Sequence, residues 1–272
     1  MGARTFGWEH VDHDVALPGV PLPWPVHRVG AGPPVIVLHE LFGMTEMYLS
    51  FCYRLADDGF TVWMPQLLGS FPSRSAVQQA AAVGALCISR EIDVLRSGRR
   101  SPVVTPLREL ASRVAATHGD DRVGVVGMCL SGGFALALAA APKVVAAVAA
   151  QPALPVRPFC GRALGLSSQD VDDIHDRLVA GEVEVFYTRF ARDPISPRSR
   201  LVATVAALDG GARVHAAQLP AEPFGVLDHA VLTAAPEKYA KREGPDAELA
   251  RERLATAAAA VSAFLTNRLP GP

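Results

Sequence analysis

The chain has 272 residues, of which 50% are hydrophobic and 19% are charged, and these values are typical of a globular protein with a substantial core. Its formal net charge of -1 gives neither the basic excess of a nucleic-acid-binding protein nor an acidic tail. The sequence contains no run of about 18 apolar residues, so no membrane-spanning helix is predicted. The charged N-terminal region lacks the apolar core of a signal peptide. Four cysteines, Cys52, Cys87, Cys129 and Cys160, show neither disulfide-framework nor metal-ligand spacing, which predicts a cytoplasmic protein without a metal site.

Short apolar runs alternate along the chain with longer segments of helical periodicity. The expected strands, in chain order, are 34–39, 60–65, 122–127, 144–150, 182–190 and 212–219. The expected helices are 46–58, 75–92, 106–117, 130–141, 197–208 and 246–269. Such alternation forms right-handed βαβ units, so we predict an α/β fold with a doubly wound, mostly parallel sheet flanked by helices. In these sheets, catalytic sites lie beyond the carboxyl ends of the strands.

No Ser/Gly-rich or charged linker divides the sequence, so we expect residues 1–272 to form a single domain. The last predicted helix carries an apolar stripe that we expect to pack on the sheet, made of Leu249, Leu254, Val261 and Phe264.

A candidate nucleophile follows the strand 122–127. The segment GMCLSG, residues 127–132, has the strand–turn–helix layout of a nucleophile elbow, with Cys129 as the nucleophile and Ser131 in place of the last glycine. Small residues are needed two positions before and after the nucleophile, because the strained turn brings backbone segments close together. The helix N-terminus that follows favours a thiolate. The alternative is a buried core cysteine at a Gly-rich packing point.

The segment HELFG, residues 39–43, follows the first predicted strand. In an elbow-containing fold, the loop at this place supplies one oxyanion-hole N–H and the residue after the nucleophile supplies the other. These donors would be the amides of Leu41 and Leu130. Over roughly residues 34–229, the chain resembles the dienelactone hydrolase family of α/β-hydrolases, which carries a Q/H-E-x-F-G segment and a G-x-C-x-G-G elbow at these two places.

This resemblance implies a Cys-Asp-His triad and a glutamate that contacts the resting thiol and moves when substrate binds. Cys129 matches the nucleophile, and Glu40 matches the glutamate. A buried carboxylate beside a thiol keeps that thiol protonated through like-charge repulsion, so the nucleophile would be quiet until substrate displaces Glu40. The alternative for Glu40 is a solvated loop carboxylate.

The acid and the base should follow the nucleophile in that order. Asp193 lies just past the strand 182–190 and before a proline, as in the family's acid-bearing turn, and is our candidate acid. The competing carboxylates are Asp170, Asp172 and Asp173, which resemble helix N-terminal charges, and Asp209, which precedes a Gly-Gly turn.

His229 lies in the loop after the last predicted strand, where this fold keeps its general base, and is our candidate base. The other histidines considered have structural interpretations: His215 lies within a strand, His175 lies in a helix of cap material, and His39 shapes the end of a strand.

The sequence departs from the family pattern at Ser131 and in two other respects. The segment between Val156 and Glu182 is longer than the family needs, and we expect a small cap or lid insertion at about 157–181. The family's substrate-carboxylate arginine has three candidates, Arg74, Arg90 and Arg99, of which Arg90 is preferred. A helix-surface ion pair is the alternative role for Arg90.

The resemblance and the triad predict a carboxylic ester hydrolase that acts on a small ester or lactone of the dienelactone (carboxymethylenebutenolide) type through a thioester acyl-enzyme. No cofactor, metal, nucleic acid or membrane is expected to take part. One alternative is a thioesterase or general carboxylesterase on the same fold. Another is a catalytically silent α/β-hydrolase that acts as a binding protein.

Overall fold

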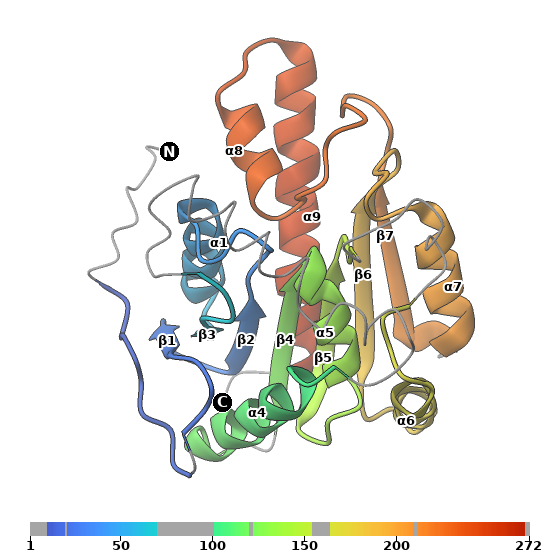
Figure 1. Ribbon diagram of the computed structural model, residues 1–272. Coiled ribbons are helices and arrows are strands. Elements are labelled where there is room, and N and C mark those ends of the chain that lie inside the picture. Colours follow the sequence, from blue (N-terminus) through green and yellow to red (C-terminus); the bar gives the residue numbers. More distant parts are fainter. Residues whose placement is uncertain are drawn as a thin grey trace.

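The computed structural model describes residues 10–19, 21–69, 101–119, 122–153, 164–208 and 211–269. Seven strands of the described chain form one sheet in the order β1-β3-β2-β4-β5-β6-β7 (Figure 1). The strands are β1 (Val26–Val29), β2 (Pro34–Leu38), β3 (Thr61–Pro65), β4 (Val123–Met128), β5 (Val144–Ala150), β6 (Glu184–Phe190) and β7 (Val214–Leu219). β1 runs antiparallel to β3, and the other neighbouring pairs are parallel.

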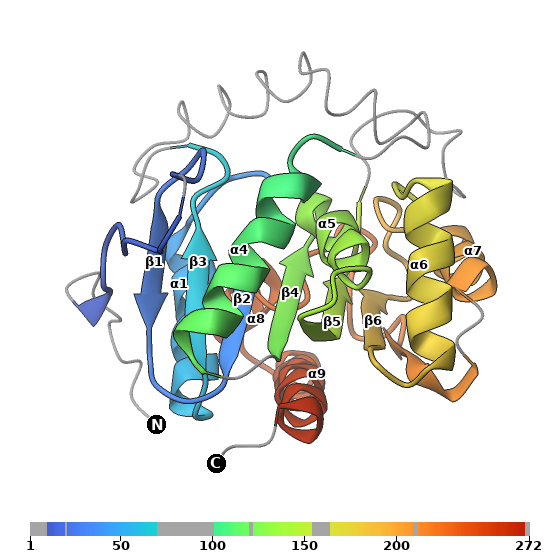
Figure 2. The same ribbon diagram turned by 90° about the horizontal axis from the view of Figure 1, so that it is seen from below.

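Helices cover both faces of the sheet (Figures 1 and 2). They are α1 (Glu46–Asp57), α4 (Val104–Thr117), α5 (Leu130–Leu138), α6 (Ser168–Val179), α7 (Arg198–Leu208), α8 (Ala234–Ala240) and α9 (Pro245–Arg268). α4, α5, α6 and α7 pack in a row on one face, and α1 and α9 cover the other. The side chains of β2 alternate between these layers: Val35 and Val37 point into one core, while Ile36 and Leu38 point into the other.

The predicted fold class is therefore the observed one, with several differences in detail. β1 was not predicted, because this strand has only four residues and directly follows a proline-rich stretch. In α9, Leu254, Val261 and Phe264 are buried as predicted. The prediction for Leu249 is wrong: this residue is 38% exposed, because the buried face of the helix contains Ala247 and Ala250 instead. The predicted helix 75–92 lies outside the described residues.

The segment in which we expected a lid contains α6, the crossover helix between β5 and β6. Ile174 and Leu178 of this helix are fully buried in the core that also contains Val185 of β6. Residues 154–163 lie outside the described part of the chain, so a lid there stays a prediction, as does the single domain. Within the described ranges, no helix is both long and apolar enough to cross a bilayer.

Candidate active site

Cys129 lies at the junction of β4 and α5 in a conformation that few residues other than glycine adopt. Its backbone angles are φ 57° and ψ -122°. A positive φ of this kind strains an L-residue and persists only where the surrounding contacts enforce it. The Cys129 N–H donates to the carbonyl of Ala150 at 3.0 Å, and the Cys129 carbonyl accepts from Gly132 at 3.0 Å and from Ala153 at 2.9 Å. These hydrogen bonds therefore hold Cys129 in the strained conformation, with its side chain partly exposed at the carboxyl end of the sheet.

The small residues of the elbow are explained by close backbone contacts. A Cβ on Gly127 would lie 2.2 Å from the carbonyl oxygen of Ser131, and a Cβ on Gly132 would lie 2.8 Å from the Cβ of Pro152. Ser131 fits because its hydroxyl has partners. The Oγ atom accepts from the Met128 N–H at 2.9 Å and lies 2.9 Å from the carbonyl oxygen of Leu38, at the end of β2. The serine thus links the elbow to the neighbouring strand.

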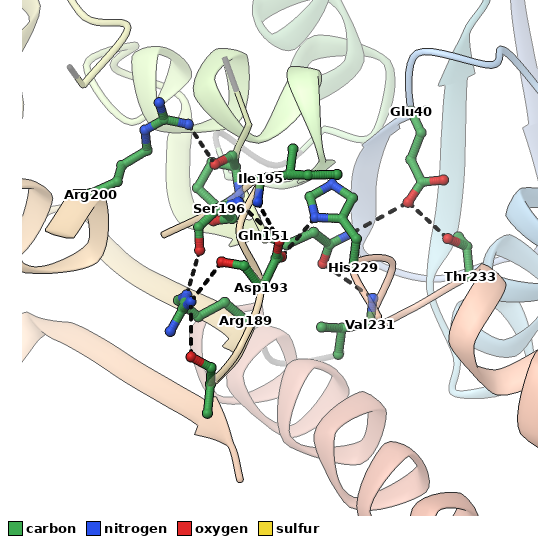
Figure 3. Close-up of polar contacts among 12 residues, drawn as sticks. Glu40, Gln151, Arg189, Asp193, Ile195, Ser196, Arg200, His229, Val231 and Thr233 are labelled. Carbon is green, nitrogen blue, oxygen red and sulfur yellow. Dashed lines mark hydrogen bonds and ion pairs between the residues drawn. The ribbon is translucent and has the colours of Figure 1, made fainter. Parts of the chain in front are cut away.

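Asp193 and His229, from loops that follow β6 and β7, form a hydrogen-bonded pair (Figure 3). Asp193 Oδ2 lies 2.7 Å from His229 Nδ1, and the Asp193 side chain is fully buried. The other carboxylate oxygen, Oδ1, accepts from the N–H groups of Ile195 at 2.8 Å and Ser196 at 3.0 Å. Because Oδ1 is occupied by the turn itself, Oδ2 remains available to orient the imidazole.

The second ring nitrogen of His229 has no hydrogen-bond partner among the described residues, although it is buried. The Cys129 side chain is nevertheless close enough to act on the ring. Burial lowers the pKa of His229, but the hydrogen bond to Asp193 and the interaction with Cys129 outweigh this effect and raise the pKa from 6.5 to about 10. The imidazolium form is therefore favoured next to Cys129.

The loop that carries His229 is held by its neighbour in sequence, Asp228. This buried carboxylate forms an ion pair with Lys238 of α8 and accepts from the Tyr239 hydroxyl at 2.7 Å and from the Gly225 N–H at 2.8 Å. Burial opposes ionisation, but these contacts lower the pKa of Asp228. α8 thereby holds the histidine loop over the carboxyl end of the sheet.

Glu40 follows β2 and is bound to the histidine side of the site (Figure 3). Its Oε1 atom accepts from the Thr233 hydroxyl at 2.8 Å and from the Gln151 amide at 3.3 Å. Burial raises the pKa of Glu40, whereas these hydrogen bonds and the charge of His229 lower it. No hydrogen bond within the described part of the chain joins Glu40 to Cys129, so the structure holds this carboxylate on the histidine loop and not on the thiol.

The two expected oxyanion donors begin the turns after Glu40 and Cys129. The ends of their strands are adjacent, because Leu38 of β2 pairs with Gly127 of β4. The amides of Leu41 and Leu130 donate to no acceptor among the described residues, which leaves both N–H groups available to a ligand.

His39 fixes the oxyanion loop. Its Nδ1 donates to the Glu40 carbonyl at 2.7 Å, and its Nε2 accepts from the Leu68 N–H at 3.2 Å. Burial lowers the pKa of His39 to about 4, so the ring is neutral and can accept that bond. This geometry matches the structural role that we expected.

Three of the competing acids and bases have other partners. Asp170 forms an ion pair with Arg108 at 2.7 Å, His215 lies 2.8 Å from Glu184, and His175 bonds the Leu208 carbonyl at 2.9 Å. Four other candidates, Asp209, Arg74, Arg90 and Arg99, lie outside the described residues. The described chain contains no group of three or more His, Cys, Asp or Glu side chains that could hold a metal ion.

Three residues of this network were missed by sequence reasoning: Gln151, Thr233 and Arg189. Gln151 directly follows β5, adopts φ 37°, and accepts from the Val231 N–H at 3.3 Å while donating to Glu40. The signal that could have found Gln151 is its polar side chain directly after a predicted strand, the place that Cys129 has after β4. Thr233 and Arg189 gave no comparable signal.

Comparisons with known proteins agree with this architecture. The sequence profile of the dienelactone hydrolase family matches residues 24–176. Among curated proteins, none matches the chain significantly. A candidate dienelactone hydrolase from Klebsiella pneumoniae subsp. pneumoniae is similar in structure, with a TM-score of 0.62 and 22% identity over 93% of this chain and 98% of that chain.

Two further solved structures have similar folds. A dienelactone hydrolase-like promiscuous phosphotriesterase from metagenomic libraries gives a TM-score of 0.55 and 17% identity, over 88% of this chain and 92% of that one. A Pyrococcus furiosus esterase gives 0.57 and 11%, over 90% of this chain and 88% of that one. Likeness at such low identity concerns the fold, and it confirms the predicted α/β-hydrolase architecture.

Proposed function

Because the chain belongs to the dienelactone hydrolase family, we propose that it hydrolyses a small ester or lactone with Cys129 as the nucleophile. The triad would be completed by His229 as the base and Asp193 as the residue that orients it. The single observation that carries this proposal is the 2.7 Å hydrogen bond from His229 to the buried Asp193, with the other ring nitrogen unpaired and the Cys129 side chain close by. A catalytically silent binding protein would have no need for this arrangement.

The proposed reaction has two halves. The Cys129 Sγ proton first passes to His229 Nε2, which gives a thiolate beside the imidazolium that the raised pKa of His229 favours. The sulfur then attacks the ester carbonyl, and the resulting oxyanion binds the amides of Leu41 and Leu130. His229 then protonates the leaving oxygen as the carbon–oxygen bond breaks, which leaves a thioester acyl-enzyme. In the second half, His229 takes a proton from water and the hydroxide attacks the thioester. The carbon–sulfur bond then breaks, the acid product leaves, and Cys129 Sγ is regenerated with its proton shared with His229. Leaving groups as good as enolates suit this chemistry.

In the proposed mechanism, Glu40 is the carboxyl group that the family resemblance places at the thiol, and in this structure it interacts with His229. Its hydrogen bonds to Thr233 and Gln151 keep the carboxylate away from the sulfur in the present structure, which supports a nucleophile that is ready to react. Arg90 is retained as the proposed contact for a substrate carboxylate. Both assignments follow from the family resemblance.

The test uses alkylation together with ester hydrolysis. Iodoacetamide should label Cys129, and hydrolysis of an aryl ester should be lost to the same extent. Cys129→Ala should abolish hydrolysis, whereas the matched variant Cys52→Ala should leave it unchanged, because Cys52 is fully buried and burial raises the pKa of its thiol. Hydrolysis that survives in Cys129→Ala would eliminate the proposed nucleophile.

Substrate preference separates the ester hydrolase from its enzyme alternatives. We propose a dienelactone-like ester or lactone, so kcat/KM should be higher for such a lactone than for an acyl thioester of similar size. The reverse order would favour a thioesterase, and equal turnover of simple aryl esters and lactones would favour a general carboxylesterase. We also propose that the protein works in the cytoplasm, which accords with the free thiols of Cys52 and Cys129.

A further inference from the structure

A buried arginine lies beneath the turn that carries Asp193. Arg189 is in the last part of β6, and the residue is 1% exposed. Its Nε donates to the Ser196 carbonyl at 2.6 Å, and one Nη donates to the Gln218 side chain of β7 at 2.6 Å. The other Nη lies 3.1 Å from the Asp193 carbonyl and 3.3 Å from the Ala191 carbonyl. The guanidinium therefore binds main-chain carbonyls at the start, middle and end of the turn 191–196. Figure 3 shows Arg189 beside Asp193 and Ser196 of this turn.

Burying a cation is costly, and here hydrogen bonds offset the cost. All four of its hydrogen-bond acceptors are neutral oxygens, and no carboxylate within the described part of the chain lies at ion-pair distance from it. Burial lowers the pKa of Arg189, whereas Asp193 and Tyr187 oppose this effect and Arg198 adds to it. If this side chain only filled space in the core, an apolar residue would do so without the desolvation cost.

The turn has two sets of restraints, and together they leave one oxygen free. Within the turn, Asp193 Oδ1 accepts from the N–H groups of Ile195 and Ser196. From below, Arg189 binds the main-chain carbonyls of Asp193 and Ser196, which lie on both sides of those N–H groups. These contacts hold the Asp193 carboxylate in one orientation, in which Oδ2 faces His229 Nδ1.

We propose that Arg189 is a positioning residue of the active site, which holds the turn 191–196 so that Asp193 orients His229. The inference rests on the proposed function, because it deepens the role of the acid in that triad. Arg189 acts through Asp193 and touches neither the nucleophile nor the proposed oxyanion donors in the described contacts.

The test compares three variants of the full chain. Arg189→Met removes the fork with a side chain of similar length, and Arg189→Lys restores the charge with fewer, differently placed donors. Arg192→Met is the matched control: Arg192 lies beside Asp193 in sequence, but its side chain is 49% exposed and pairs with Glu222 at 3.0 Å. The readouts are kcat and KM for an aryl ester, the pKa of His229 by NMR, and the downfield proton signal of its Nδ1–H.

In Arg189→Met we expect kcat to fall on the order of a hundredfold, the size of effect that a small misplacement of a catalytic group produces, with KM little changed. The pKa of His229 should fall towards 6.5 and the Nδ1–H signal should weaken, because the hydrogen bond to Asp193 is loosened. Arg189→Lys should recover part of both effects, and Arg192→Met should match the wild type.

The direction of the pKa change makes the test decisive. If Arg189 acted only through its charge, its removal would raise the pKa of His229, since a nearby cation would be lost. A rise or no change would overturn the inference. If Arg189→Met does not fold, Gln218→Leu releases one arm of the guanidinium and should lower the pKa of His229 by a smaller amount, and no change there would be equally damaging. Because the NMR readout needs no turnover, an inactive wild type or an active Cys129→Ala would refute the proposed function without deciding the role of Arg189.

Discussion

The Glu40 carboxylate shows how single contacts set the charge state of a residue in this site. It lies where burial favours the neutral acid, and two donors from distant parts of the chain favour the anion. Thr233 supplies the shorter of the two hydrogen bonds, at 2.8 Å against 3.3 Å for Gln151. The threonine should therefore contribute more than the glutamine to opposing the rise in the pKa of Glu40 that burial causes.

Replacing Thr233 by valine keeps the shape of this buried side chain and removes the hydroxyl. We predict that the pKa of Glu40, already raised by burial, rises further in Thr233→Val, because the anion loses its best donor. The measurement is an NMR titration of the Glu40 carboxyl carbon, assigned by its absence in Glu40→Gln. A titration curve that coincides with the wild type would show that Thr233 does not stabilise the anion.

The proposed triad residues share one property: each lies after the carboxyl end of a strand of the parallel part of the sheet, Cys129 directly and Asp193 and His229 in the loops that follow. Cys129, Asp193 and His229 could be chosen because strand order and the elbow pattern fix where a nucleophile, an acid and a base belong. Arg189 could not, because it lies within a strand, and whether a strand arginine points to solvent or beneath a loop depends on the neighbouring strand. Thr233 was equally hidden, since its partner Glu40 is 193 positions away in sequence.

At the scale of elements, the elbow depends on how closely β4 and α5 approach each other. Gly127 and Gly133 are both buried glycines near this junction, but only Gly127 faces backbone. A Cβ at position 127 would meet the Ser131 carbonyl oxygen at 2.2 Å, whereas a Cβ at position 133 has no atom within 4 Å. The two positions therefore make a matched pair.

We predict that Gly127→Ala destabilises the protein by about 1–3 kcal/mol or more and lowers the rate of Cys129 alkylation, because the turn has to open to admit a methyl group. Gly133→Ala should instead be neutral or stabilising by up to about 1 kcal/mol, as expected for alanine in place of glycine within a helix. Urea unfolding and iodoacetamide kinetics measure both effects. Equal losses in the two variants would show that close approach is not what selects Gly127.

The predicted boundaries of helices and strands differ from the observed ones by a few residues, because tertiary contacts decide where an element ends. The helix predicted over 106–117 begins two residues earlier, at Val104, and the strand predicted over 182–190 begins at Glu184. α6 was interpreted as cap material because the segment between Val156 and Glu182 is longer than the family needs, yet its buried Ile174 and Leu178 pack it on the sheet. From the sequence alone, so narrow an apolar stripe does not show whether the helix packs on the sheet or on a cap.

For the whole molecule, the pair formed by Asp193 and His229 links folding to pH. The pKa of His229 is raised from 6.5 to about 10 in the folded protein. The folded state therefore holds this proton more tightly than the unfolded chain does. The resulting stabilisation is fully present below pH 6.5 and is lost as the pH rises through about 10.

We predict that the free energy of unfolding falls between pH 6.5 and about 10, and that Asp193→Asn makes this fall shallower. The amide cannot supply the negative charge that raises the pKa of His229, so the folded and unfolded states would release the proton over a narrower pH range. Urea unfolding of both proteins across this range gives the difference in slope. Buried Cys52, whose pKa is also raised, contributes a similar alkaline loss, but it is present in both proteins and cancels in the comparison. Parallel curves would mean that Asp193 does not hold the proton on His229, and the proposed orientation of the base would lose its physical basis.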